Sequence, residues 1–189
     1  MNQTTNTSPL ELAPELSTSA WLNTNEPITL ASLRGRVVMI HAFQMWCPGC
    51  VARALPQAQR VVEAFEGAPL VVLGLHTVFE HHEAMKIESL RAFVHEYRIR
   101  FPVGVDAPDP HGAPIPQTMR KYGMRGTPTT LLIDARGRLR RQVFGAHEDL
   151  LLGAEIQTLL LEADATSRHE GNATDEHSVC DANGCAVPE

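Results

Sequence analysis

Residues 37–50 of the chain read VVMIHAFQMWCPGC, a nearly continuous apolar run that leads into two closely spaced cysteines. The apolar run predicts a central strand covered on both faces, and a second run of this kind, PLVVLGL, occupies residues 69–75. Between the two runs, apolar residues recur at helical spacing: Val51, Ala54, Leu55, Ala58, Val62 and Phe65. They predict a helix that begins near Cys47, kinks at Pro56 and stops at Gly67. Together these segments form a strand–helix–strand unit.

The two cysteines, Cys47 and Cys50, lie at the start of the predicted helix. Strand–helix–strand crossovers are right-handed, so this helix N-terminus lies at the carboxyl edge of the sheet, where open α/β proteins place their sites. The unpaired N–H groups and the dipole at that end favour a thiolate, which makes Cys47 the expected nucleophile. Cys50 lies one helical turn further on. We expect it to be the resolving thiol, which attacks a mixed disulfide formed on Cys47.

The remaining segments predict a central mixed β-sheet flanked by helices, and therefore an α/β fold. Residues 16–30 alternate loosely around a turn at 23–25 and predict an N-terminal β-hairpin extension ahead of the main sheet. Further predicted elements are a helix spaced by Ile87, Leu90, Val94 and Tyr97, an extended segment at 101–105, a short helix at 117–122, a hairpin of 129–134 with 139–144, and a last helix at about 147–161.

Composition and charge limit the classes of function. The chain has 189 residues, of which 43% are hydrophobic and 20% charged, and this is typical of one compact soluble domain with short extensions. From Glu162 onward, seven acidic residues stand against the single Arg168 and account for the whole net charge of −6. The rest of the chain has no basic excess, so neither nucleic acid nor an acidic membrane surface is an expected partner.

We expect three regions along the chain. These are a flexible leader over residues 1–15, a folded domain over 16–162, and an acidic, disordered tail over 163–189. No apolar stretch approaches the roughly 20 residues of a membrane span, and the N-terminus has neither the basic start nor the apolar segment of a signal peptide. The expected location is therefore cytoplasmic, where structural disulfides are rare and four cysteines indicate another use.

Two other interpretations of Cys47 and Cys50 are half of a zinc site and a pair of inert buried thiols. A structural zinc site needs a second pair of ligands. Cys180 and Cys185 could supply that pair, but they lie in the acidic tail at a looser spacing. Redox chemistry is the favoured interpretation, and no metal is predicted in the site.

The chain resembles the thioredoxin superfamily, in particular its TlpA-like branch of thiol-disulfide oxidoreductases among the redoxins. The resemblance rests on residues 37–50, on Pro56, and on YGMRGTPTTLLID at 122–134 with Gly137 three residues later. It covers most of the chain and implies a thioredoxin-like fold. It also implies that Pro128 is a cis-proline against the dithiol, and that substrate contacts Trp46, Thr127 and Pro128.

One residue departs from the family pattern. Six residues before the first cysteine, thioredoxins usually carry a buried acid and TlpA-like proteins often an asparagine, whereas this chain has His41. Strand alternation places His41 under the active-site helix, near Cys50. One hypothesis is that neutral His41 takes the proton from Cys50 when Cys50 attacks, since imidazole titrates close to neutral pH. The alternative is a hydrogen-bonded core histidine with no catalytic part.

Peroxiredoxins share this fold and are the rival family within it. They resemble one another in a Pro-x-x-x-Thr/Ser-x-x-Cys stretch, whose polar residue positions peroxide beside the thiolate. Counted back from Cys47, this chain has Gln44 and Ile40 at those two places. The peroxidase signature is therefore absent, and a second cysteine three residues after the nucleophile is the oxidoreductase pattern.

Two weaker features remain. His76, His81, His82 and Glu83 cluster after the second apolar run, but their spacing fits no standard zinc signature, so we expect a polar loop near the active-site edge. The second feature is the pair of tail cysteines, Cys180 and Cys185, for which four roles are open. It could relay electrons to the main site, bind a soft metal together with His177, form a passive disulfide loop, or be an unconstrained end.

The sequence as a whole predicts a thiol-disulfide oxidoreductase that exchanges disulfides with protein or small-molecule partners. In a reducing cytosol the net direction is reduction, and a thiol or a reductase must recharge the dithiol. No organic cofactor is required. The alternatives are a peroxide-reducing enzyme and a redox-sensing or soft-metal-binding module that uses the tail cysteines.

Overall fold

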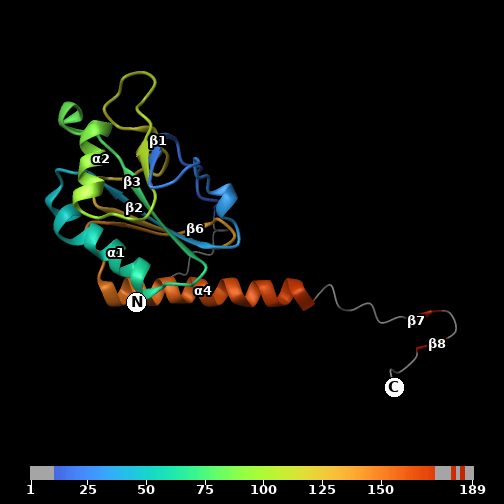
Figure 1. The fold of residues 1–189 in the computed structure, drawn as a ribbon. Coiled ribbons are helices and arrows are strands. Elements are labelled where there is room, and N and C mark those ends of the chain that lie inside the picture. The colour runs from blue at the N-terminus through green and yellow to red at the C-terminus, as the bar shows by residue number, and fades with distance from the viewer. Residues whose placement is uncertain (1–10, 173–179, 182–183, 186–189) are drawn as a thin grey trace, which may run out of the picture.

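The chain is built on a six-stranded mixed sheet with helices on both faces, as seen in a computed structural model that describes residues 11–172, 180–181 and 184–185 (Figure 1). The strands of this sheet are β1 (Thr18–Leu22), β2 (Val37–Phe43), β3 (Leu70–His76), β4 (Val103–Asp106), β5 (Thr129–Ile133) and β6 (Leu139–Phe144). The helices are α1 (Leu55–Ala64), α2 (Ile87–Glu96), α3 (Gln117–Lys121) and α4 (Asp149–Asn172). The strand order is β1-β4-β3-β2-β5-β6, in which β2, β3 and β4 are parallel and the other strands pair antiparallel.

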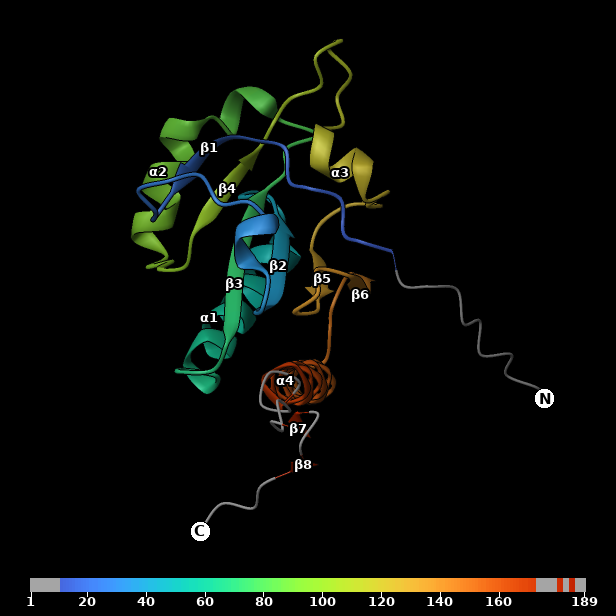
Figure 2. The same ribbon diagram turned by 90° about the vertical axis from the view of Figure 1, so that its right-hand side faces the viewer.

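The two faces of the sheet have separate hydrophobic cores. Because β2 lies between two paired strands and under helices, every one of its residues is buried. Helices α1, α2 and α4 pack on the face that carries Met39 and Phe43. Helix α3 and the N-terminal segment pack on the opposite face, which carries Val38 and Ile40. Figure 2 shows α1 and α2 on one side of the strands and α3 on the other.

The helix after the cysteines begins irregularly. A π-helical turn over Cys50–Ala54 precedes α1, and Pro56 is in the first turn of α1. Proline has no N–H to donate to the preceding turn, so the widened turn lies where an ordinary helical hydrogen bond could not form. The sequence predicted a simple kink at Pro56, and the structure has this π-helical turn instead.

The predicted N-terminal hairpin is wrong. In its place, β1 pairs antiparallel with β4 at the edge of the main sheet, with Trp21 opposite Gly104. A Cβ on Gly104 would lie 3.1 Å from the Trp21 ring, so the missing side chain leaves the room that this ring fills. The segment expected to form the second strand has no strand and leads into a short 3-10 helix, Ala31–Leu33. The amides of Leu30 and Ala31 donate to the carboxylate of Glu15.

The described part of the leader is packed rather than free. The Ala13 amide donates to the carbonyl of Gly137 at 2.9 Å, and Leu12 forms a bridge with Arg138. Glu11 accepts a bond from the Leu139 amide at 3.2 Å. The expectation of a flexible leader is therefore wrong for residues 11–15, while residues 1–10 lie outside the described part of the chain.

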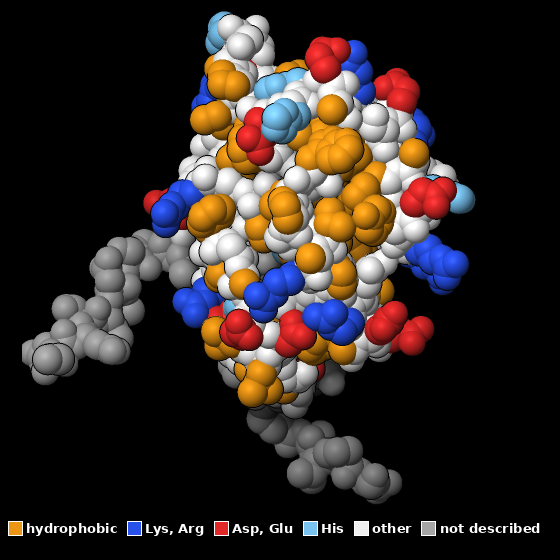
Figure 3. Space-filling model, turned by 90° about the vertical axis from the view of Figure 1, so that its left-hand side faces the viewer, with side chains coloured by type: hydrophobic (Ala, Val, Ile, Leu, Met, Phe, Trp, Pro, Cys, Tyr) orange, Lys and Arg blue, Asp and Glu red, His pale blue; other side chains and the backbone are white. Residues whose placement is uncertain are grey.

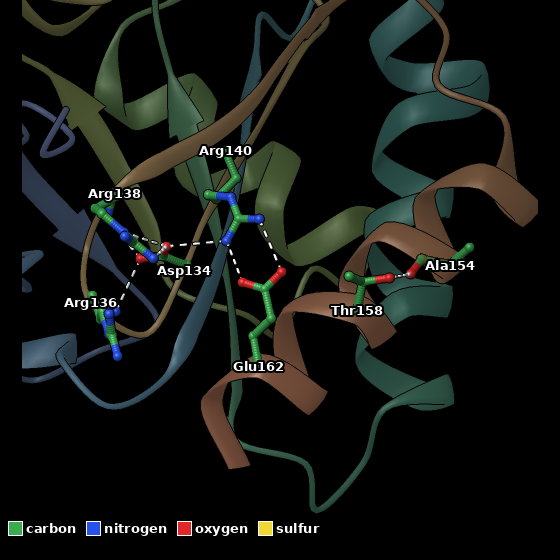
Figure 4. A network of polar contacts seen from close by, with 7 residues as sticks. All are labelled: Asp134, Arg136, Arg138, Arg140, Ala154, Thr158 and Glu162. Carbon is green, nitrogen blue, oxygen red and sulfur yellow. Dashed lines mark hydrogen bonds and ion pairs between the residues drawn. The ribbon is translucent and has the colours of Figure 1, made fainter. Parts of the chain in front are cut away.

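Helix α4 is longer than the sequence predicted, because it continues past residue 161 to Asn172. Figure 4 shows one contact that holds this helix to the sheet. The Arg140 guanidinium bridges Asp134, at the end of β5, and Glu162 of α4, with a 3.0 Å bond from Arg140 Nη2 to Glu162 Oε1. Ala163 is also buried. The expected start of a disordered tail at residue 163 thus falls inside a helix, and Glu162 belongs to the folded body.

A second, two-stranded ladder joins β7 (Cys180–Asp181) and β8 (Gly184–Cys185), with Cys180 opposite Cys185. The other residues of the predicted tail beyond Asn172, including His177, lie outside the described part of the chain. No helix among the described residues has the length and apolar character needed to cross a membrane.

Candidate active site

The CPGC motif joins the carboxyl end of β2 to α1 and faces the loop that leads into β5. In that loop the Thr127–Pro128 peptide bond is cis, as the resemblance implied. Gly49 packs directly on this proline, since a Cβ on Gly49 would lie 3.4 Å from Pro128 Cδ. Cys47 Sγ donates to the Thr127 carbonyl oxygen at 3.5 Å. The fold thus brings two segments that are distant in sequence into contact at the first thiol.

The two thiols of the motif have opposite environments. Cys47 is half-buried, whereas Cys50 is fully buried behind it, and both are free thiols. The Cys50 amide donates to Cys47 Sγ at 3.4 Å, a contact that favours negative charge on that sulfur. Burial, helped by a hydrogen bond with Cys47, raises the pKa of Cys50 to about 12. Cys47 is therefore the thiol that a substrate can reach, and Cys50 is held protonated until it reacts.

Trp46 lies beside the accessible thiol and exposes 66% of its surface. A large apolar side chain that is left in water next to a reactive group is a natural contact for a bound partner. The structure therefore places Trp46, Thr127 and Pro128 around Cys47, which is the arrangement that the substrate-contact prediction requires.

Gln44 is a site residue whose part the sequence analysis missed. Its side chain is buried, accepts a bond from the Phe79 amide at 3.3 Å and donates to Glu80 Oε1 at 3.3 Å. Its carbonyl accepts the Cys47 amide at 3.2 Å. Gln44 thus ties the loop after β3 to the start of the cysteine motif. A polar residue at the end of an otherwise apolar strand was the signal that could have revealed it.

His41 lies on the face of β2 that α1 covers, as strand alternation predicted. It alternates with Met39 and Phe43, which pack in the same core as Cys50. Its Nδ1 lies 3.3 Å from Thr130 Oγ1, and its buried Nε2 has no hydrogen-bond partner among the described residues. Burial lowers the pKa of His41 to about 4, so the ring is neutral at pH 7. None of the hydrogen bonds described for this side chain goes to Cys50.

The histidines after the second central strand do not act as one group. His76 is buried at the end of β3 against Phe43, with ring centroids 5.4 Å apart, and burial lowers its pKa to about 4. His82 and Glu83 are exposed in a short 3-10 turn, where Glu83 pairs with Lys86 at 2.7 Å. Within the described residues, no three His, Cys, Asp or Glu side chains cluster closely enough to hold a metal ion.

The comparisons with known proteins agree with this geometry. The AhpC/TSA family model matches residues 10–142. The chain belongs to the AhpC/TSA family. Among curated proteins, it is 31% identical over 154 residues to protein DipZ of Mycobacterium bovis, a match that covers 80% of this chain and 21% of DipZ. It is 23% identical over 116 residues to the thiol-disulfide oxidoreductase ResA of Geobacillus thermodenitrificans, covering 61% of this chain and 59% of ResA. This AhpC/TSA chain therefore spans about a fifth of DipZ and less than two thirds of ResA.

Solved structures confirm the predicted thioredoxin-like fold of this AhpC/TSA protein. A crystal structure of a thioredoxin-like superfamily protein matches with 58% identity and a TM-score of 0.76, covering 79% of this chain and 96% of the other. The structure of a thiol-disulfide isomerase from Corynebacterium glutamicum matches with 44% identity and a TM-score of 0.74, covering 78% and 96%. The predicted resemblance to the thioredoxin superfamily and its redoxins is confirmed.

Proposed function

We propose that the protein is a thiol-disulfide oxidoreductase that exchanges disulfides through Cys47 and Cys50. The observation that carries the proposal is the contrast between the two thiols, one half-buried beside a cis-proline and one fully buried with a raised pKa. A reactive outer thiol and a protonated inner thiol are what a two-step exchange requires. The names of the curated relative ResA and of the Corynebacterium isomerase support this activity.

In the first step, the Cys47 thiolate attacks one sulfur of a substrate disulfide. A bond forms between Cys47 and that sulfur, the substrate disulfide bond breaks, and the other substrate sulfur leaves as a thiolate. The Cys50 amide, 3.4 Å from Cys47 Sγ, favours the attacking charge. The exposed Trp46 and the Thr127 backbone offer the surface on which the substrate lies.

In the second step, Cys50 loses its proton and attacks Cys47 Sγ. The substrate leaves with both sulfurs reduced, and a Cys47–Cys50 disulfide remains. The proton must leave a buried thiol whose pKa is about 12, so this step needs a base. One candidate base is neutral His41, which lies on the face of β2 that α1 covers and has a free Nε2 among the described residues. A pKa of about 4 makes this ring a weak base, so a core histidine with no catalytic part is the competing assignment. An external thiol or reductase then supplies two electrons to restore the dithiol.

Single-cysteine variants test the assignment. With a protein disulfide as substrate and dithiothreitol as donor, Cys47→Ser is expected to lower reduction to the rate of the donor alone. Cys50→Ser is expected to stop after the first step and to accumulate a mixed disulfide on Cys47, seen as a mass increase that a reductant removes. Full reduction activity in Cys47→Ser would refute the proposed function.

The peroxide-reducing alternative has no support at the two positions that would carry it. Gln44 is committed to Phe79 and Glu80 through its side chain. Ile40 is fully buried and packs in the core on the opposite face of the sheet from Cys50. Neither side chain is available to position a peroxide beside Cys47.

The electron relay through Cys180 and Cys185 remains a prediction, as does a cytoplasmic location in which the net direction is reduction. The backbone register that sets Cys180 opposite Cys185 is compatible with a tail dithiol. Replacing both tail cysteines with serine tests the relay without disturbing α4, whose residues Glu162 and Ala163 belong to the folded body. An unchanged rate of recharging by the donor would remove the relay idea.

A further inference from the structure

A cavity of about 550 Å³ opens directly beside the dithiol, between the first turns of the active-site helix and the loop that joins β6 to α4. Gly49 and the cis-proline Pro128 form its end nearest to the thiols, and Gly145 and Ala146 continue the wall. A Cβ at position 49 would lie in ordinary van der Waals contact with Pro128, 3.4 Å from its Cδ, so the start of the active-site helix and the cis-proline meet at this end of the cavity. The volume is in the range of a small-molecule site.

At the far end of the cavity, polar contacts of Gln57 and Arg60 with the start of α4 hold the two walls together, and we call them the Gln57 clamp. Gln57 is buried in α1, and its amide nitrogen donates to the His147 carbonyl and to Asp149 Oδ1, both at 2.6 Å. Arg60 pairs with the other Asp149 oxygen at 2.9 Å. The hydrogen bond from Gln57 and, next in size, that from Arg60 lower the pKa of Asp149. Both oxygens of Asp149 are already bonded across the two walls, so this carboxylate joins α1 to the start of α4.

Two further charged groups on the cavity wall form no salt bridge with another described residue, although the Arg53 charge lies near enough to Asp149 to help lower the pKa of that carboxyl. Arg53 lines the cavity from the π-helical turn, and Glu148 lines it from the start of α4. The cavity therefore offers one positive and one negative group on opposite walls. Figure 3 looks onto the side of the molecule where α4 begins, and basic and acidic side chains lie side by side toward its lower edge.

We propose that this cavity binds the amino-acid-like part of a small zwitterionic disulfide, with a carboxylate on Arg53, an ammonium group on Glu148, and the disulfide at Cys47. The opposed charges fit a ligand that carries both signs, and a neutral disulfide would leave both wall charges unused. The proposal rests on the proposed function, since the bound disulfide is consumed by the same two-step exchange. Cys47 forms the mixed disulfide and releases one small thiol, and Cys50 then releases the second and leaves the Cys47–Cys50 disulfide.

The test uses the full chain with its dithiol reduced and measures the rate at which small disulfides oxidise it, followed by Trp fluorescence. The probes are cystine, which is zwitterionic, cystamine, which is a dication, dithiodiglycolate, which is a dianion, and neutral hydroxyethyl disulfide. Each rate is divided by the rate at which free dithiothreitol reduces the same probe. This ratio corrects for differences in the chemical reactivity of the four disulfides. Cystine is expected to react about tenfold faster than hydroxyethyl disulfide on this scale, the upper range of what two exposed ion pairs supply.

Charge variants locate the effect. Arg53→Gln is expected to slow cystine and dithiodiglycolate about threefold to fivefold, and Glu148→Gln to slow cystine and cystamine by a similar factor, while hydroxyethyl disulfide is unaffected. Arg53→Glu is expected to make cystamine the preferred probe. Arg91→Gln, on the exposed face of α2, is the matched control and is expected to change none of the rates.

Two different failures are distinguishable. If all four probes oxidise the dithiol at the same relative rate, or if Arg53→Gln behaves like Arg91→Gln, the cavity proposal is overturned and disulfide exchange stands. If no probe oxidises the dithiol, the proposed function itself fails, and the cavity proposal fails with it.

Discussion

The two faces of the central sheet are built from the same strands but have different chemistry. On the face covered by α3, the strand side chains that form the hydrophobic core are aliphatic: Val38, Ile40, Ala42, Leu73, Leu75, Leu131 and Ile133. On the face covered by α1, α2 and α4, the aliphatic core is interrupted by two neutral histidines, His41 and His76, and by the resolving thiol Cys50. The α3 face also buries two polar side chains, Asp106 and Thr129, but both are hydrogen-bonded. On the other face, the Nε2 atoms of both histidines have no hydrogen-bond partner among the described residues.

This contrast shows where the fold carries its function. The buried Nε2 atoms of His41 and His76 have no hydrogen-bond partner among the described residues, and leaving such a group unpaired costs about 1–3 kcal/mol. The aliphatic face offsets that cost. The polar groups lie on the face under the active-site helix, where a raised thiol pKa and a neutral base are useful.

The largest expected effect is a loss of stability in mild acid that comes from the polar face. Burial lowers the pKa of both His41 and His76 from 6.5 to about 4. Between these values the unfolded chain binds protons that the folded chain does not, so the free energy of unfolding falls as pH falls from 6.5 to 4. Each histidine is expected to contribute about 3 kcal/mol, or about 6 kcal/mol for both.

Urea unfolding at several pH values between 7 and 4 measures this loss. His76→Leu is expected to remove about half of the pH dependence. His95→Gln, which changes an exposed histidine on α2, is the matched control and is expected to leave the dependence unchanged. A free energy of unfolding that stays constant from pH 6.5 to 4.5 would show that the buried histidines are not neutral in the folded chain.

The next effect comes from neighbouring residues that point to opposite faces. Leu131 is fully buried in the aliphatic core, and Leu132 is fully buried in the core that contains Cys50. Either residue changed to alanine is expected to lower the free energy of unfolding by about 2–5 kcal/mol, because each leaves a cavity. Only Leu132→Ala is expected to change the rate at which Cys50 resolves a mixed disulfide.

Chemical denaturation and single-turnover exchange, both at pH 7, measure the two quantities for each leucine variant. If Leu131→Ala altered the resolving rate as much as Leu132→Ala does, the core on the α3 face would be coupled to the active site. The conclusion that only the face containing Cys50 affects exchange would then be wrong.

The sequence predicted the features that depend on local pattern and missed those that depend on distant contacts. The apolar run into Cys47 and the periodicity after it suffice to predict β2, the active-site helix and the order of the two thiols. The pairing of β1 with β4 depends on the space above Gly104, and the extension of α4 is accompanied by a contact between Arg140 and Glu162. No pattern within a single segment contains either contact.

The site shows the same division. His41 could be assigned to the correct face because strand alternation is a local rule. The Gln57 clamp on Asp149 joins residues that are far apart in the chain, so the cavity beside the dithiol could not be found from spacing. Gln44 is intermediate, since its position directly after the apolar strand was visible in the sequence but its partners, Phe79 and Glu80, were not.

The smallest of these effects, and the most specific to mechanism, concerns His41 itself. If His41 accepts the proton of Cys50, His41→Ala is expected to slow the resolving step about tenfold at pH 7, a modest share of what general bases supply. The deficit should shrink as pH rises, because hydroxide then removes the proton from a thiol whose pKa is about 12. A preformed mixed disulfide on Cys47, with release of the second thiol followed from pH 6 to 10, measures this step alone.

His76→Ala is the matched control for that experiment, because it removes a second buried neutral histidine from the same face of the sheet. A general loosening of the core would slow both variants alike and would leave the shape of the pH profile unchanged. Transfer of the proton to His41 would change the profile only in His41→Ala. If the two variants have the same profile as the unmodified protein, His41 is a core histidine, and the proton of Cys50 leaves by another route.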